Sequence, residues 1–104
     1  MEKFAFVMQL KPGFEAEYKK RHDEIWPELV QALKGAGISD YSIYLEESSQ
    51  RLFAVLWRGD SHGMDELPEK PIVRRWWDYM ADIMETEPDN TPATTPLKLM
   101  FHLD

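Results

Sequence analysis

The segment YKKRHDEIWPEL, residues 18–29, decides how the first half of the chain folds. Tyr18 and His22 are four residues apart, so on a helix they share one face, and the apolar residues that follow continue it. Pro27 has no backbone N–H, and its ring clashes with the carbonyl of Asp23, so the helix must kink or end and then restart. An inward-facing histidine beside irregular backbone is typical of a functional site. A core histidine next to an ordinary proline kink gives the same pattern.

The length and composition indicate one globular domain. A chain of 104 residues can bury one core but not two, so we expect a single domain over residues 1–104. Hydrophobic residues make up 43% and charged residues 30% of the chain, which is typical of a globular protein and not of a disordered one. The absence of cysteine excludes disulfides, iron–sulfur clusters, thiolate zinc sites and a cysteine nucleophile.

Charge and hydropathy narrow the range of partners and locations. The formal net charge is −7, which makes nucleic acid and anionic membranes unsuitable partners. No apolar run approaches the ~20 residues of a membrane span, and no signal peptide precedes Phe4. We therefore expect a cytoplasmic protein that binds neither nucleic acid nor membrane.

The apolar pattern predicts a strand, a broken helix and a hairpin in the first part of the chain. Lys3–Leu10 is apolar on both faces, which indicates a central strand covered on both sides. The broken helical region runs from residue 14 to 33 and stops at the glycines at 35–37. Tyr41–Glu46 and Leu52–Trp57 alternate as strands joined by a short polar loop. Tyr41 begins its strand at the sheet edge, where its hydroxyl can face a cleft, although a half-buried strand aromatic is an equally good interpretation.

The second part of the chain contains one helix and one strand. Residues 58–71 hold two glycines and two prolines, which predicts a loop with at most one helical turn. Pro71 can open the next helix, and a buried stripe then follows at helical spacing: Ile72, Val73, Trp76, Met80 and Ile83. Trp76 and Trp77 diverge by about 100° on a helix, so one indole can lie in the core while the other lines a groove. A polar loop at 88–92 precedes a final predicted strand, Leu97–Leu103.

These elements follow the order β-α-β-β-α-β. This order predicts an α+β fold of the ferredoxin-like type, with a four-stranded antiparallel sheet and helices on one face. The other face carries too many apolar residues to remain in water. We therefore expect a homodimer in which two sheets pack face to face as a dimeric α+β barrel.

The candidate chemistry is proton transfer without metal or cofactor. His22, His62 and His102 are widely spaced and form no HxxxH or HxH pair, so we expect no metal site. The sequence contains no phosphate-binding glycine loop, dinucleotide fingerprint or GxSxG elbow, and we expect no cofactor. What remains is a histidine with tyrosines and paired indoles, which suits a neutral polyhydroxylated ligand. Sugar anomerisation is a reaction that needs only an acid and a base.

The chain resembles the L-rhamnose mutarotase family along nearly its whole length. The matching stretches are FAFVMQLKPG, EYKKRHDEIWPEL, DYSIYLE, LFAV, RWWDYM and MFHLD. The resemblance implies interconversion of the anomers of L-rhamnose in the cytoplasm, as a first step of its catabolism, and a dimeric α+β barrel. It also implies that His22 is the proton donor and that Tyr18, Tyr41, Trp76 and Trp77 bind the substrate. The two indoles would then form an apolar wall against the sugar ring and the C6 methyl group.

Part of the chain lies outside the matching motifs. Residues 58–72 align with none of them, so substrate preference depends on whether this loop covers the pocket. Asp89 and Asn90 are further candidates for polar contacts, and a role in capping their turn is an equally good interpretation.

Two other classes of function fit the same sequence. One is an oxygenase or haem-degrading enzyme with the same barrel architecture, since a fold does not determine a function. The other is a non-catalytic sugar-binding or dimerisation module, in which the aromatic groove binds without turnover.

Overall fold

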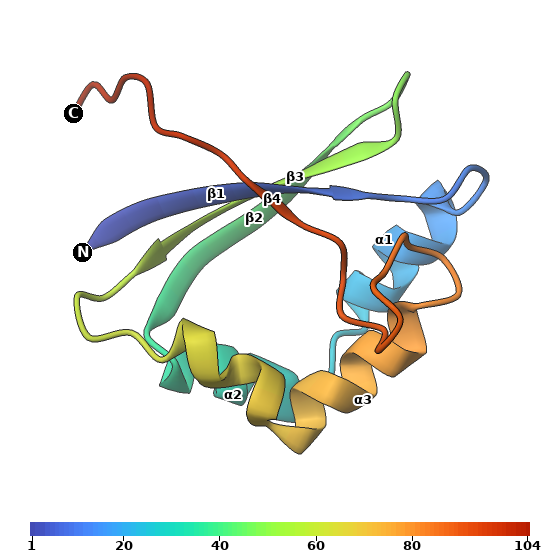
Figure 1. Cartoon of the computed structure of the whole chain (residues 1–104), viewed down its shortest axis with the longest axis horizontal. Coiled ribbons are helices and arrows are strands. Elements are labelled where there is room, and N and C mark those ends of the chain that lie inside the picture. The colour runs from blue at the N-terminus through green and yellow to red at the C-terminus, as the bar shows by residue number, and fades with distance from the viewer.

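Strands and helices alternate along the chain in the predicted order. The computed structural model describes residues 1–104 (Figure 1). Its elements are β1 (Glu2–Gln9), α1 (Glu15–Asp23), α2 (Pro27–Gly35), β2 (Ile38–Glu46), β3 (Arg51–Arg58), the 3₁₀ helix η1 (Met64–Glu69), α3 (Pro71–Met80) and β4 (Thr95–Pro96). The α+β class and the ferredoxin-like element order are confirmed. None of the helices is long and apolar enough to cross a bilayer.

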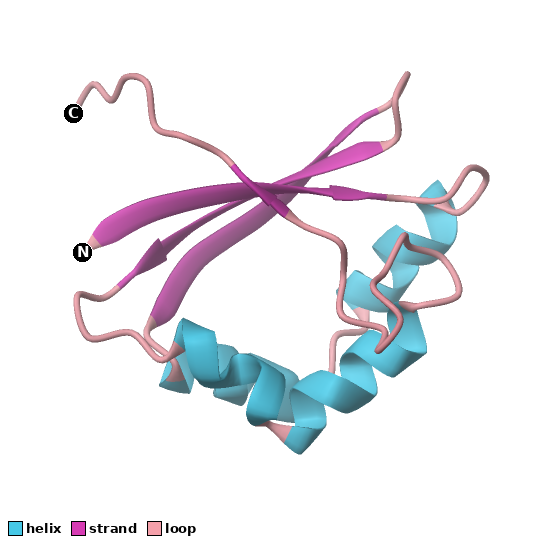
Figure 2. Cartoon of the chain, viewed as in Figure 1, coloured by secondary structure: helices cyan, strands magenta, loops and turns pink.

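The four strands form one antiparallel sheet in the order β2-β3-β1-β4. The β1 strand is central, as predicted, and pairs with β3 along its full length from Glu2↔Arg58 to Gln9↔Arg51. All helices lie on one side of this sheet (Figure 2). The core fills the space between the two layers, where the largest fully buried side chains are Leu10, Leu52, Leu56, Met80 and Ile83.

The two faces of the sheet differ in what covers them. On the inner face, Phe6 and Met8 of β1 are buried beneath the helices. On the outer face, alternate residues of the same strand, such as Ala5 and Val7, are half-buried, and no helix lies over them. The predicted cover on both sides of β1 is therefore present within this chain on the inner face only.

The predicted break in the first helical region separates α1 from α2. Trp26 has extended backbone (φ −67°, ψ 129°), as expected for a residue before proline, and Pro27 is the first residue of α2. The second helix ends at a left-handed glycine, Gly37, with φ +85°. Gly37 donates to the carbonyl of Lys34 at 3.0 Å and accepts from the N–H of Gly59 at 3.0 Å, which ties the end of α2 to the loop after β3.

The strand predicted to begin at Tyr41 begins three residues earlier, at Ile38. Its pairing with β3 shifts between Ser39 and Ser42, and Asp40 within this bulge has φ +49°. A bulge inserts an extra residue and reverses the alternation of side chains beyond it. Tyr41 therefore lies within the strand at the bulge, and not at its start.

The final strand was predicted in the wrong place. Only Thr95–Pro96 form β4, opposite Val7 and Phe6, and the backbone N–H of Leu97 adds one further bond to Ala5. Residues 98–104 leave the sheet and form no regular element. The alternating apolar pattern is typical of a strand, but a strand also needs a partner, and this segment has none within the chain.

A matched pair of glycine substitutions tests the turn after α2. Gly37→Ala should lower the free energy of unfolding by about 1–2 kcal/mol, because a left-handed conformation places Cβ against the following carbonyl. Gly35→Ala should instead raise it by about 0.5–1 kcal/mol, since Gly35 is helical and a methyl group there meets no atom within 4 Å. Urea unfolding at one protein concentration measures both. Equal effects at the two positions would contradict this account of the turn.

Candidate active site

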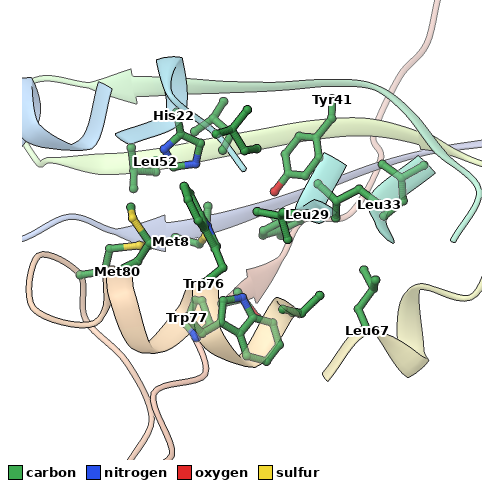
Figure 3. A pocket seen from close by; sticks show the side chains of 18 of the residues that line it. Met8, His22, Leu29, Leu33, Tyr41, Leu52, Leu67, Trp76, Trp77 and Met80 are labelled. Atoms are coloured by element: carbon green, nitrogen blue, oxygen red, sulfur yellow. The ribbon is translucent and has the colours of Figure 1, made fainter. Parts of the chain in front are cut away.

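A pocket of about 1060 Å³ lies between the inner face of the sheet and the helices (Figure 3). Its size is slightly above the roughly 300–1,000 Å³ that is typical of ligand pockets. Most of its wall is apolar, with contributions from β1, β2, α2 and α3. The polar and charged side chains on this wall, among them His22, Asp23 and Asp65, therefore decide what chemistry it can perform.

His22 lies in the last turn of α1 and lines the pocket. Its Nδ1 is 3.1 Å from the carbonyl oxygen of Tyr18. Because a carbonyl can only accept a hydrogen bond, Nδ1 carries the hydrogen. The lone pair of the neutral imidazole is therefore on Nε2, which has no hydrogen-bond partner within the chain and is available to a ligand.

Aromatic rings enclose the imidazole of His22. The ring of Tyr18 stacks on it with centroids 4.3 Å apart, and Trp76 meets it edge to face at 5.4 Å. This burial lowers the pKa of His22, and the hydrogen bond to the Tyr18 carbonyl and the charge of Asp23 only partly oppose the shift. At neutral pH the imidazole is therefore a neutral base.

Two tyrosine hydroxyls border the same pocket. Tyr18 is 8% exposed, and burial raises its pKa, with a further rise from Tyr41 nearby. Tyr41 reaches the pocket from the bulge in β2; the residue as a whole is 37% exposed, but desolvation of its hydroxyl raises its pKa to about 12. Neither hydroxyl has a hydrogen-bond partner within the chain. Both therefore stay protonated and can pair with hydroxyl groups of a ligand.

The adjacent indoles occupy different positions, as the helical geometry predicts. Trp76 is 7% exposed and packs between His22 and the ring of Trp26, whose centroid is 5.0 Å away. Trp77 is half-buried, with the guanidinium of Arg74 5.4 Å from its ring. Both indoles line the pocket (Figure 3). The structure thus brings together all five residues predicted for the site.

Other pocket residues were missed from the sequence. The η1 helix contributes Met64, Asp65, Leu67 and Pro68, so part of the unaligned loop at 58–72 does cover the pocket. Thr91 and Thr94 also line it, since the chain between α3 and β4 folds back along the pocket rim. The glycines and prolines of both segments marked them as loops but carried no signal of where they lie.

Asp89 and Asn90 do not line the pocket. Asp89 accepts from the N–H of Thr91 at 3.0 Å and from Arg74 at 3.4 Å, and Asn90 donates to Asp78 at 3.1 Å. These bonds hold the loop onto α3, which agrees with the turn-capping interpretation. No cluster of three His, Cys, Asp or Glu side chains could share a metal ion.

Comparisons with a family model and with known sequences agree on one family. A family model described as L-rhamnose mutarotase matches residues 3–103. The chain is 66% identical over 102 residues to an L-rhamnose mutarotase of Mesorhizobium japonicum, covering 98% of this chain and 97% of that relative. It is 62% identical over 103 residues to an L-rhamnose mutarotase of Jannaschia sp., with 99% of each chain covered.

Among the solved structures that match this chain, one is similar in sequence and fold and another is similar in fold alone. A crystal structure of an L-rhamnose mutarotase from Formosa agariphila superimposes with a TM-score of 0.94 at 43% identity, covering 100% of both chains. A structure from Bordetella bronchiseptica, titled as an antibiotic biosynthesis monooxygenase, superimposes with a TM-score of 0.66 at 14% identity, over 95% of this chain and 96% of that one. The second similarity concerns the fold only.

The lowered pKa of His22 can be measured by NMR titration. We expect a value below 6.5 in the folded chain and near 6.5 in the same chain unfolded in urea, because burial disfavours the imidazolium. The unfolded chain then binds this proton more tightly, so acidification below pH 6.5 lowers the free energy of unfolding. A folded pKa equal to or above the unfolded one would contradict this environment.

Proposed function

The chain belongs to the L-rhamnose mutarotase family, and we propose that it interconverts the α and β anomers of L-rhamnose in this pocket. The observation that carries the proposal is the free Nε2 of His22, which faces a pocket lined by two tyrosine hydroxyls and two indoles. Such a reaction needs a proton to be moved between two oxygens that are bonded to one carbon. A single imidazole with one free nitrogen suits this task.

The proposed reaction opens and closes the sugar ring. Nε2 of His22 accepts the proton of the anomeric hydroxyl, the C1–O1 bond becomes a carbonyl, and the C1–O5 bond breaks. The same imidazolium donates the proton to the ring oxygen, which is the donor role that the family resemblance implies. Rotation about C1–C2 presents the other face of the aldehyde, and the reverse steps close the ring as the other anomer. No metal or cofactor enters these steps.

Tyr18 and Tyr41 are proposed to hold the sugar. Their hydroxyls stay protonated at neutral pH, so each can donate to a sugar oxygen and accept from a sugar hydroxyl. They come from α1 and β2, on two sides of the pocket. Such contacts orient the ring so that its anomeric centre meets His22.

The indoles of Trp76 and Trp77 are proposed as the wall against the apolar side of the sugar. Aromatic faces pack against C–H groups, and the C6 methyl of a 6-deoxy sugar needs no hydrogen-bond partner. A hydroxyl at C6 would be left unpaired against this wall, which costs about 1–3 kcal/mol. The wall therefore favours L-rhamnose over L-mannose.

We also propose that the protein acts as a homodimer in the cytoplasm, in the catabolism of L-rhamnose. The support for a dimer is the tail after β4, which lies on the side of the sheet away from the helices (Figure 1). Its apolar residues are strongly exposed: Leu99 65%, Met100 84%, Phe101 79% and Leu103 80%. Tyr44, on the outer face of β2, is 66% exposed. A second copy that packs its sheet on this face would bury both the tail and the face.

Anomer exchange by NMR tests the proposed reaction directly. Saturation transfer between the two anomeric protons of equilibrated L-rhamnose should be accelerated by the protein, and that of D-glucose far less. His22→Asn should reduce the rate by roughly 10²–10⁴-fold, since it removes the proton carrier. In the unchanged protein the rate should fall as the pH drops through the lowered pKa of His22, because protonated Nε2 cannot accept a proton.

A second histidine supplies the matched control. His62 accepts from the N–H of Met64 at 3.2 Å and does not line the pocket, and an asparagine oxygen can replace that acceptor. His62→Asn should leave the rate unchanged. If the protein accelerates no hexose, the proposed function is wrong. If it binds L-rhamnose without acceleration, the sugar-binding module is the better interpretation, and bound haem or colour on purification would favour the oxygenase.

Light scattering tests the homodimer. The 12.3 kDa chain should give twice its mass at micromolar concentration. Replacing both Leu99 and Phe101 by Asp should shift it toward monomer, because two charges would have to be buried in the interface. Lys98→Asp, in the same tail, changes charge without removing apolar surface and should leave the dimer intact. A stable monomer of the unchanged chain would rule the proposal out.

A further inference from the structure

Little apolar packing holds the last turn of α1, which carries His22. Tyr18 is the only buried residue of α1, and the helix stops at Asp23. Short helices in proteins depend mainly on tertiary packing for their stability. Tyr18 and Trp76 contact the imidazole of His22 directly, so its position also depends on what holds this turn of α1 against α3.

Arg21, the residue before His22, connects this turn to the end of α3. Its Nη1 donates to the carbonyl oxygen of Tyr79 at 2.8 Å and to Oδ1 of Asp82 at 2.9 Å, and its Nη2 donates to Oδ2 of Asp82 at 3.3 Å. Its Nε donates to Glu17 at 2.7 Å within α1. The Arg21 side chain is 10% exposed and that of Asp82 is 65% exposed, so the guanidinium is the desolvated partner. A two-pronged bond to a guanidinium on a largely covered side chain differs from an ordinary surface ion pair.

A continuous series of aromatic contacts leads from Arg21 to the pocket. The guanidinium carbon lies 4.4 Å over the ring of Tyr79, and Tyr79 stacks on Trp26 with centroids 5.4 Å apart. Trp26 meets Trp76 edge to face at 5.0 Å, and Trp76 meets His22 in the same way at 5.4 Å. The indole that packs against the imidazole thus contacts Tyr79, 5.7 Å away, and Tyr79 is the residue that Arg21 contacts.

We propose that Arg21 is a positioning residue, which holds His22 against Trp76 by joining the last turn of α1 to the end of α3. Arg21 does not line the pocket, so it acts through His22 and not on the sugar. The inference rests on the proposed function, because it concerns the same proton transfer. The hydrogen bond with Asp82 raises the pKa of Arg21 and lowers that of Asp82, so both partners remain charged across the neutral range.

Two variants on opposite sides of the contact test the proposal. Arg21→Met and Asp82→Leu each remove the bonds between Arg21 and the carboxylate of Asp82, and each is measured for anomer exchange of L-rhamnose and for the pKa of His22 in sugar-free protein. In both, kcat should fall roughly 10- to 100-fold, because a misplaced reacting group loses the productive geometry. KM should change little, since the tyrosines remain in place. The pKa of His22 should rise toward 6.5, because water reaches the loosened imidazole.

The two variants distinguish an effect of the position of His22 on its pKa from an effect of the lost charge. Arg21→Met removes a positive charge, which alone raises the pKa of His22, whereas Asp82→Leu removes a negative charge, which alone lowers it. The other charged neighbour, Asp23, is unchanged in both. An upward shift in both variants therefore supports positioning. Shifts of opposite sign, or a normal kcat in both, would overturn the proposal.

Arg75→Met is the matched control. Arg75 lies on α3, is 59% exposed and makes a 3.5 Å ion pair with Glu28 of α2, so the same substitution there should change neither kcat nor the pKa of His22. If Arg21→Met fails to fold, as judged by circular dichroism, Asp82→Leu alone decides the outcome. If the unchanged protein does not exchange the anomers of L-rhamnose, the proposed function fails, and the pKa of His22 in the variants still tests the positioning.

Discussion

Pro27 lacks a backbone N–H and its ring excludes a helical carbonyl four residues back, so one continuous helix cannot cross this segment. The chain therefore ends α1, passes through extended backbone at Trp26 and restarts as α2. The corner turns Trp26 onto Trp76 and leaves His22 in a final turn beside the pocket. That turn has few apolar contacts of its own. The contacts of Arg21 matter because the proline has already detached this turn from the helix that follows.

The predictable parts of the structure are those specified by local sequence. Alternation of apolar residues located β1 and the hairpin, and helical spacing located α3 from Pro71 onward. The neighbours Trp76 and Trp77 were expected to diverge because side chains one residue apart cannot share a helical face. The grouping of site residues followed from the family resemblance, since residues 18–29 taken alone favoured a core histidine. Each of these inferences needs only a short window of sequence.

The unpredicted parts depend on partners that are distant in the chain or lie outside it. The bulge at Asp40 changes which face of the sheet Tyr41 occupies. The only local sign of it in the sequence is that Ile38 does not fit the apolar alternation of the later strand residues. Arg21 meets Asp82 across 61 positions, and no local pattern indicates such a pair. The tail after β4 has the alternation of a strand but lacks a partner in its own chain. Sequence periodicity indicates which secondary structure a segment can form, whereas the tertiary structure determines which residues are close enough to pair with it.

The placement of β1 at the centre of the sheet has a consequence for the order in which the protein is made. Gln9 ends β1. Thr95, in the neighbouring strand β4, is synthesised 86 residues later. At about 5–20 residues per second this interval is roughly 4–17 s. During this time the edge of β1 that will pair with β4 stays unpaired on the ribosome. Glu2 and Lys3 place charges at the beginning of that strand, where they discourage pairing with other chains. The nascent chain is therefore most exposed to misassembly just before its last residues emerge, when nearly all of the pocket has already been synthesised.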